Sequence, residues 1–381
     1  MACRSKLCFV IVMCIGFVPG LSFAEEGSVA HKLEGPITIE DFRKDSSGLY
    51  DRNERPNLPV VDSHIHFRPF GGKPKPFSET VNYLRNNGVL FANVYGIGQR
   101  LPVDSDCTYY LDCPGVAVTP SLKSDFFNAQ SYLDEKPEDI YLNVSMTNPD
   151  LKDPEQMVRD FDLLVHEFPG VFAMAGEVNL VKQALFENGR TGVDGTEIDG
   201  WAPFMAKLEE NGFPINFHSD LGNDADPTKY LPLMEKTLRL YPNNKIIWAH
   251  LGGLSKELRD IDPDEHIAIL ERLFKQYPNL YIDLSWRVLD DQVFSDPDKR
   301  AAYIAFINRW PDRFLPGTDF VASDNKSESV YRDEFLATSD IYQDLGDEAF
   351  RKIALGQNFF DLYHLDYKAP GIYHDDSIGS Q

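Results

Sequence analysis

Hydrophobic and polar residues follow two alternating patterns along most of this chain. Stretches with apolar residues at helical spacing end at a Gly or Pro, and a short run of β-branched and aromatic residues follows each of them. In the stretch that begins at Trp201, the residues Phe204, Met205 and Leu208 complete the i, i+3, i+4, i+7 spacing of an amphipathic helix, and Gly212 is a natural helix stop. The pattern therefore predicts helices that alternate with strands.

Eight of the apolar runs have the length of buried strands. They lie near residues 59–66, 89–95, 140–146, 171–178, 214–219, 245–250, 279–285 and 313–319. Strands separated by helices form parallel sheets, and nearly continuous apolar strands are covered on both faces. Eight such units match the count and size of a (β/α)8 TIM barrel. We expect a single α/β barrel domain over residues 59–381. An open, doubly wound sheet is the alternative, although it lacks a phosphate-cradling glycine motif here.

The N-terminal segment differs in composition from the rest of the chain. Arg4 and Lys6 precede a short apolar stretch that ends before an acidic segment. This order is typical of a signal peptide, here residues 1–24, and the apolar stretch is short for a membrane span. We expect an exported protein, periplasmic or secreted. Residues 25–58 are charged and rich in turn-forming residues, and we expect an N-terminal extension that lies over the barrel.

Export would affect which cysteines the mature chain keeps and whether they are oxidised. Three of the five cysteines lie within the predicted signal peptide, and the mature chain keeps Cys107 and Cys113. In an oxidising compartment two cysteines this close can form a disulfide that closes one loop. Two buried free thiols are the alternative.

The net charge of the chain limits the classes of molecule that it can bind. The formal net charge is -23, and no basic run interrupts the acidic sequence. Such a surface repels nucleic acid and anionic lipid. We therefore expect a small-molecule substrate and no nucleic-acid partner.

Polar side chains gather at the ends of the predicted strands, where TIM barrels carry their catalytic residues. These side chains are His64 and His66 on the first strand, Glu177 on the fourth, His218 on the fifth, His250 on the sixth and Asp319 on the eighth. Imidazole nitrogens combined with a carboxylate suit zinc. One histidine or one HxH pair is weak evidence, because buried histidines without metal are common. Their coincidence on separate strands predicts a site for a divalent metal.

Several motifs resemble those of a known family. The segments "VDSHIHF", "INFHSD", "IWAHLGG" and "PGTDF", in that order, resemble the metal-dependent amidohydrolase superfamily. The segment "IALGQNFFDLY" resembles the closing helix of the amidohydrolase-related branch, which includes aminocarboxymuconate semialdehyde decarboxylase and related hydrolases. The resemblance implies that His64, His66, His218 and Asp319 hold a divalent ion. It places His250 beside the ion, either to polarise the substrate carbonyl or to bind a second ion. Relatives often dimerise, which leaves a homodimer open.

Glu177 leaves the number of ions open as well. Dinuclear members of the superfamily often have a carbamylated lysine at the end of the fourth strand, where this chain has Glu177, with Lys182 five residues beyond. Glu177 resembles the bridging glutamate of TatD-like deoxyribonucleases, which would imply a second ion. The other motifs resemble the mononuclear branch, so we favour one ion. If Glu177 binds no metal, a buried ion pair with Arg287 or Lys182 is the alternative.

The expected ligand set predicts a hydrolytic mechanism. Three nitrogens and one carboxylate leave a position for water, whose pKa a metal lowers toward neutrality. Asp319 can accept the proton of that water and pass it to the leaving group. We therefore expect hydrolysis of an amide, ester or lactone carbonyl, with Asp319 and His250 as catalytic residues. A non-oxidative decarboxylase or hydratase on the same barrel is the first alternative, and a binding protein without activity is the second.

Substrate contacts are expected just beyond the strand ends. Arg68, Arg100 or Arg287 could hold a substrate carboxylate, although arginines at such positions are more often in solvated ion pairs. Trp286 could line an apolar pocket. The sequence identifies none of these contacts by itself.

Overall fold

The computed structural model describes residues 30–147 and 150–375. The predicted signal peptide lies outside these residues. Among the helices that are described, none is both long enough and apolar enough to cross a membrane.

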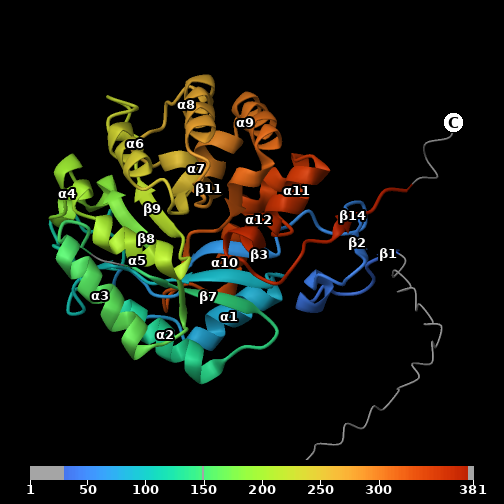
Figure 1. Cartoon of the computed structure of the whole chain (residues 1–381), viewed down its shortest axis with the longest axis horizontal. Coiled ribbons are helices and arrows are strands. Elements are labelled where there is room, and N and C mark those ends of the chain that lie inside the picture. Colours follow the sequence, from blue (N-terminus) through green and yellow to red (C-terminus); the bar gives the residue numbers. More distant parts are fainter. Residues whose placement is uncertain (1–29, 148–149, 376–381) are drawn as a thin grey trace, which may run out of the picture.

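A parallel sheet forms the centre of the molecule (Figure 1). In the described part of the chain it contains nine strands, in the order β12-β11-β10-β9-β8-β7-β4-β3-β13. Their bounds are β3 Val61–His66, β4 Phe91–Tyr95, β7 Tyr141–Met146, β8 Phe172–Val181, β9 Ile215–Ser219, β10 Ile246–Trp248, β11 Leu280–Leu284, β12 Phe314–Pro316 and β13 Phe320–Val321. Each of the eight predicted strands falls on one of these, which confirms the (β/α)8 barrel.

The last barrel strand is divided into two parts. β12 pairs with β11, and after a turn at residues 317–319 β13 pairs with β3. The Asp319 amide donates to the His64 carbonyl at 2.7 Å, which joins the last strand to the first and closes the sheet. Gly317 allows this approach, because a Cβ at that position would lie 2.8 Å from the His64 Cβ. The sequence predicted one continuous strand here.

Helices surround the sheet (Figure 1). They are α1 Phe77–Asn86, α2 Lys123–Glu135, α3 Pro154–Glu167, α4 Gly195–Asp199, α5 Ala202–Asn211, α6 Leu231–Leu240, α7 Ala249–Gly253, α8 Pro263–Gln276, α9 Pro297–Arg309, α10 Glu328–Ser339, α11 Asp347–Ile353 and α12 Gln357–Leu362. Three of them begin at an Asp-Pro pair, in which the Asp side chain accepts hydrogen bonds from the first turn: Asp153, Asp262 and Asp296. Proline fits the first helical position because a backbone N–H at that position would have no partner within the helix, so its absence costs nothing.

A small sheet lies beside the barrel (Figure 1). β1 His31–Lys32 and β14 Gly371–Ile372 both pair in parallel with β2 Gly48–Tyr50, so segments near the two ends of the chain meet. Phe42, between β1 and β2, is buried, with its ring centroid 5.4 Å from that of Phe91. The described part of the predicted extension therefore packs against the base of β4.

The long connection after β4 forms two short elements before α2. β5 Gln99–Arg100 pairs with β6 Thr119–Pro120 in antiparallel fashion, and the segment between them contains the predicted disulfide between Cys107 and Cys113. Tyr109 and Tyr110 lie in the closed loop. The bond thus fixes an aromatic loop at the substrate side of the barrel, where the strands end.

The barrel interior below the strand ends is polar. The Asn143 amide donates to Asn93 Oδ1 at 3.1 Å, and Asn93 donates to the Ser63 carbonyl at 2.9 Å. Asn216 Nδ2 donates to Asp283 Oδ2 at 2.8 Å. Because buried polar groups are costly unless paired, this network holds the inward-facing side chains in defined positions.

We expect the free energy of unfolding to depend on pH because of His266 in α8. Its Nδ1 lies 2.8 Å from the Tyr303 hydroxyl, and burial lowers its pKa from 6.5 to about 4. The unfolded chain therefore takes up this proton at a higher pH than the folded chain does, and stability falls as the pH decreases below about 6.5. From this residue alone we expect a loss of about 2 kcal/mol in unfolding free energy between pH 7 and pH 5.

Urea unfolding of the wild type and His266→Gln at both pH values measures this effect. The wild type should lose more stability than the variant, because glutamine takes up no proton. An equal pH dependence in the two proteins would contradict the prediction.

Candidate metal centre

The structure brings all six predicted metal-site side chains into one cluster. His64 and His66 end β3, Glu177 lies in β8, and His218 lies in β9; His250 follows β10, and Asp319 lies between β12 and β13. The four histidines and Glu177 are buried, and the Asp319 side chain is 14% exposed. Side chains distant in sequence therefore meet at the carboxyl ends of the strands, the catalytic end of a TIM barrel.

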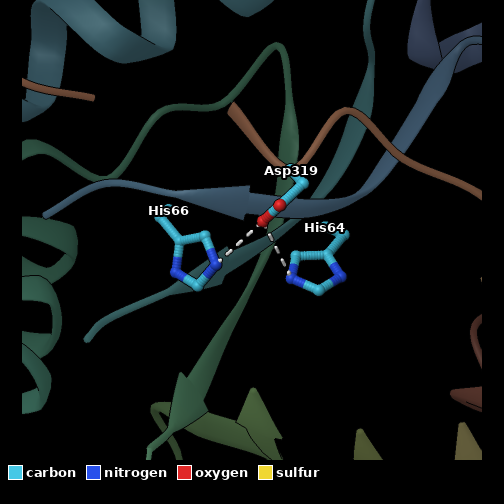
Figure 2. Close-up of side chains that lie close together, drawn as sticks. All are labelled: His64, His66 and Asp319. Carbon is cyan, nitrogen blue, oxygen red and sulfur yellow. Dashed lines mark ion pairs between the residues drawn. The ribbon is translucent and has the colours of Figure 1, made fainter. Parts of the chain in front are cut away.

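His64, His66 and Asp319 form the first group (Figure 2). Asp319 Oδ1 points between the two imidazole rings, 3.2 Å from His66 Nε2 and 3.5 Å from His64 Nε2. Although both Nε2 atoms are buried, neither has a hydrogen-bond partner among the described residues. Buried polar atoms without partners are uncommon, and these two face a carboxylate. Two nitrogens and one oxygen at such distances are a fitting donor set for a divalent ion.

The Nδ1 atom of each of these rings has a hydrogen-bond partner on the side away from Asp319. His66 Nδ1 lies 2.7 Å from the Gly96 carbonyl, which can only accept, so Nδ1 donates. His64 Nδ1 lies 2.9 Å from Asp283 Oδ2. A proton on Nδ1 leaves the Nε2 lone pair free, and the partner fixes the ring orientation. Both histidines are therefore prepared to bind through Nε2.

Glu177, His218 and His250 form the second group. Glu177 Oε1 contacts His218 Nδ1 directly and lies 3.5 Å from His250 Nε2. His66 Nε2, 3.5 Å from Glu177 Oε2, links the two groups. Asp220 Oδ1 lies 3.0 Å from His218 Nε2 and orients that ring. Both groups could hold a metal ion by the type and spacing of their atoms.

Lys182 is the ion-pair partner of Glu177. Its Nζ lies 3.2 and 3.4 Å from the two carboxylate oxygens, and its side chain is 11% exposed. Arg287, the other candidate partner, is exposed and pairs with Asp291 instead. The second group thus already contains a fixed positive charge.

Electrostatics inside the cluster favour positive charge. Burial alone would lower the pKa of His66, but Asp319 and Glu177 outweigh burial and raise it to about 9. Burial would raise the pKa of Asp319, but contact with His66 and the charges of His250 and His64 lower it to about 2. A divalent cation would replace the protons held here, so metal binding should release protons.

Asp283 of β11 is a residue of the site that the sequence analysis missed. Besides His64 and Asn216, it accepts a hydrogen bond from the His250 backbone amide at 2.9 Å and from Ser285 Oγ at 2.5 Å. It is completely buried, and its histidine contacts hold its pKa far below the usual range despite burial. A charged residue in the otherwise apolar "LYIDL" was the available signal.

Asp283 also determines the protonation of His250. Ser285 Oγ donates its proton to Asp283, so it accepts from His250 Nδ1, which lies 2.9 Å away. The Nε2 atom of His250 then carries the lone pair. Burial lowers the pKa of this ring, so it is neutral near pH 7. His250 therefore presents an unprotonated nitrogen to the cluster.

Asp62 and Thr318 hold the turn that carries Asp319. Asp62 accepts hydrogen bonds from the Thr318 amide at 3.0 Å and from its hydroxyl at 2.8 Å. Asp319 itself has a φ of 57°, a region that residues other than glycine rarely adopt. The fixed turn therefore maintains the position of the carboxylate.

The four predicted substrate contacts lie in different surroundings. Arg68 donates to Asn128 Oδ1 of α2 at 2.8 Å. Arg100 is half-buried near Ser124, and Arg287 is exposed. Trp286 is the one of the four with a ring contact to the described cluster, at 4.9 Å between its centroid and that of His250.

Replacement of Asp283 by asparagine is expected to weaken metal binding. An amide retains the shape but places a donor against donors, so His64 loses its fixed orientation. Changes in such outer partners typically reduce metal affinity about 10- to 100-fold. Competition with a chromogenic chelator measures the affinity, with the exposed Asp291→Asn as the control. Unchanged affinity in Asp283→Asn would show that Asp283 does not support the ligands.

The sequence was compared with protein families and with curated proteins. A family model described as amidohydrolase matches residues 153–358, which contain Glu177, His218, His250, Asp283 and Asp319. The HxH pair of β3 precedes the matched segment. A search of curated proteins found no match.

Solved structures share the architecture at low identity. A structure from Agrobacterium tumefaciens is 14% identical, with a TM-score of 0.50, over 85% of this chain and 98% of the other. Dihydroorotase from Saccharomyces cerevisiae is 13% identical, with a TM-score of 0.48, over 81% and 84% of the two chains. Beta-aspartyl dipeptidase from Fervidobacterium islandicum is 13% identical, with a TM-score of 0.47, over 84% and 76%. These values describe similarity of the fold and do not indicate the substrate of this chain. Because the family model matches more than half of the chain, this protein belongs to the amidohydrolase family and is an enzyme.

Proposed function

We propose that this enzyme is an exported, metal-dependent hydrolase of an amide, ester or lactone carbonyl. One divalent ion, preferably zinc, is held by His64, His66, His218 and Asp319. The observation that carries the proposal is the pair of buried Nε2 atoms of His64 and His66, which have no partners among the described residues and face Asp319. Nitrogen donors with a carboxylate are the ligands that zinc prefers in proteins.

Lys182 supports one ion rather than two. A second ion bound by Glu177, His218 and His250 would lie close to the Lys182 ammonium, which is 3.2 Å from Glu177. Like charges in a buried site repel strongly, and the ammonium already compensates the Glu177 carboxylate. In this proposal Glu177 compensates Lys182 and binds no metal. Because Asp220 holds His218 Nε2, the ion would replace Glu177 at His218 Nδ1.

Protein side chains can carry out the proton transfers of hydrolysis. When bound, a divalent ion supplies Lewis acidity, which lowers the pKa of water and polarises a carbonyl. The Asp319 carboxylate, partly exposed and beside His64 and His66, takes the proton of the attacking water and returns it to the leaving group. The unprotonated Nε2 of His250 is a second acceptor. Once protonated, it can donate a hydrogen bond to the substrate oxygen.

Two measurements on the purified protein test the proposal. Elemental mass spectrometry should find about one ion per chain, and an ester-and-lactone panel should contain at least one substrate. Carbon dioxide release from an aromatic or enoic acid, with no hydrolysis of the panel, would favour the lyase alternative. Absence of metal after incubation with zinc or manganese would contradict the metal centre.

Export is the second part of the proposal. The signal-like N-terminal segment and the Cys107–Cys113 disulfide support it, because such bonds persist in oxidising compartments. Mass spectrometry of the secreted or periplasmic protein should give a mature chain that begins after Ala24. A full-length chain retained in the reducing cytoplasm would contradict export. The homodimer stays a prediction from the family resemblance.

A further inference from the structure

Aromatic side chains extend from the metal cluster on the side of β3. The Phe70 ring, just after β3, lies 6.4 Å from the His66 ring and 5.6 Å from the Tyr109 ring, centroid to centroid. Tyr109 is part of the loop closed by the Cys107–Cys113 disulfide. All these residues follow the carboxyl ends of strands, where TIM barrels bind substrates. One wall beside the cluster is therefore aromatic and is held by a covalent cross-link.

A second aromatic wall lies on the His250 side of the cluster. Trp286 follows β11, and its ring lies 4.9 Å from the His250 ring. Its φ of 83° is unusual for a bulky residue, and such backbone positions gather at functional sites. Lys256, which follows α7, lies 5.9 Å from the Trp286 ring and 5.1 Å from the Tyr109 ring. Lys256 therefore connects the two walls.

The charge of Lys256 is available to a ligand. Its Nζ donates to the Tyr109 hydroxyl at 3.2 Å, and no ion pair of Lys256 occurs in the described part of the chain. The Lys256 side chain is exposed, whereas the side chain of Lys182, the other lysine near the cluster, is only 11% exposed and is compensated by Glu177. An ammonium has three donors, so two remain beside the Tyr109 hydroxyl. In a chain with a net charge of -23, an uncompensated cation beside the reaction centre selects anions.

We propose that these residues select a carboxylate-bearing substrate with a planar, apolar body. Lys256 binds the carboxylate, while Phe70, Tyr109 and Trp286 pack against the body. One ammonium matches one singly charged group, and aromatic rings pack best against flat apolar surfaces. The inference rests on the proposed function, because the reacting carbonyl has to lie at the metal cluster, one aromatic ring away from Lys256.

Two probes that differ in one charge test the inference. 3-Carbamoylbenzoate carries one carboxylate for Lys256 and a neutral amide carbonyl for the metal cluster, whereas isophthalamide replaces that carboxylate by a second neutral amide. Isothermal titration of the metal-loaded, full mature protein should show that 3-carbamoylbenzoate binds about tenfold more tightly than isophthalamide. Lys256→Met should abolish this preference, and Lys256→Arg should retain most of it. The control is Lys275→Met, since Lys275 is an exposed lysine of α8 that pairs with Glu271.

Several outcomes would overturn the inference: equal affinity of the wild type for both probes, no binding of either probe, or a preference that survives in Lys256→Met. Metal content and ester hydrolysis are measured on the same samples. Loss of metal or of hydrolysis in the wild type would count against the proposed function alone, whereas a charge preference that depends on Lys256 supports the inference independently.

Discussion

Replacement of His66 by alanine is expected to reduce the metal content from about one ion per chain to less than about a tenth. His66 supplies a buried Nε2 that faces Asp319 at 3.2 Å and also lies 3.5 Å from Glu177. Removal of this nitrogen leaves an incomplete donor set, and alanine provides no substitute. Hydrolysis should fall to the background rate at the same time. Elemental mass spectrometry after extensive dialysis measures the change.

His166→Ala is the matched control for this experiment. His166 lies on the exposed face of α3, and its replacement should leave the metal content unchanged. Far-ultraviolet circular dichroism of both variants separates loss of metal from loss of fold. A folded His66→Ala protein that retains a full ion would show that His66 is not a ligand, and the ligand set would have to be assigned again.

Replacement of Asp319 by asparagine is expected to reduce kcat by about 10²- to 10⁴-fold, the usual contribution of a general acid–base residue. The amide keeps an oxygen that can face His64 and His66, so part of the metal affinity should remain. The amide cannot accept a proton at neutral pH, so the proton transfer to the leaving group is lost. Steady-state kinetics on the most reactive ester of the panel, together with metal content, separate the two effects.

Asp324→Asn provides the comparison, since Asp324 is exposed and lies five residues farther along the chain. Its kcat should equal that of the wild type. If Asp319→Asn holds metal and retains at least about a tenth of the wild-type kcat, Asp319 is not the proton carrier, and His250 would be the remaining candidate.

The sequence pattern predicted most of the barrel, because buried parallel strands are apolar along their whole length. All eight expected runs lie in the central sheet. The division of the last strand into β12 and β13 was not predictable. It depends on the close approach of Gly317 to His64, two residues at opposite ends of the barrel sequence. The pattern of one strand contains no information about its partner.

The site was predictable where chemistry and strand ends coincide. His64, His66, His218 and Asp319 are polar residues at the ends of apolar runs. The structure places His64, His66 and Asp319 in one group and His218 in the adjoining group with Glu177 and His250. The supporting residues were harder to recognise. Asp283 was one acidic residue within a strand, and its importance comes from contacts made by three other segments. The choice of Lys182 over Arg287 as the partner of Glu177 likewise required coordinates.

The turn that carries Asp319 has a consequence for how the protein is assembled. β3 is the first barrel strand to leave the ribosome and β13 the last, so His64 and His66 meet Asp319 only when the ring closes. An ion on these three residues would cross-link the beginning and the end of the barrel, a contact with a high entropic cost of closure. Metal capture and completion of folding would then be a single cooperative event, and a nascent chain that stops before β12 would have no metal centre to fill.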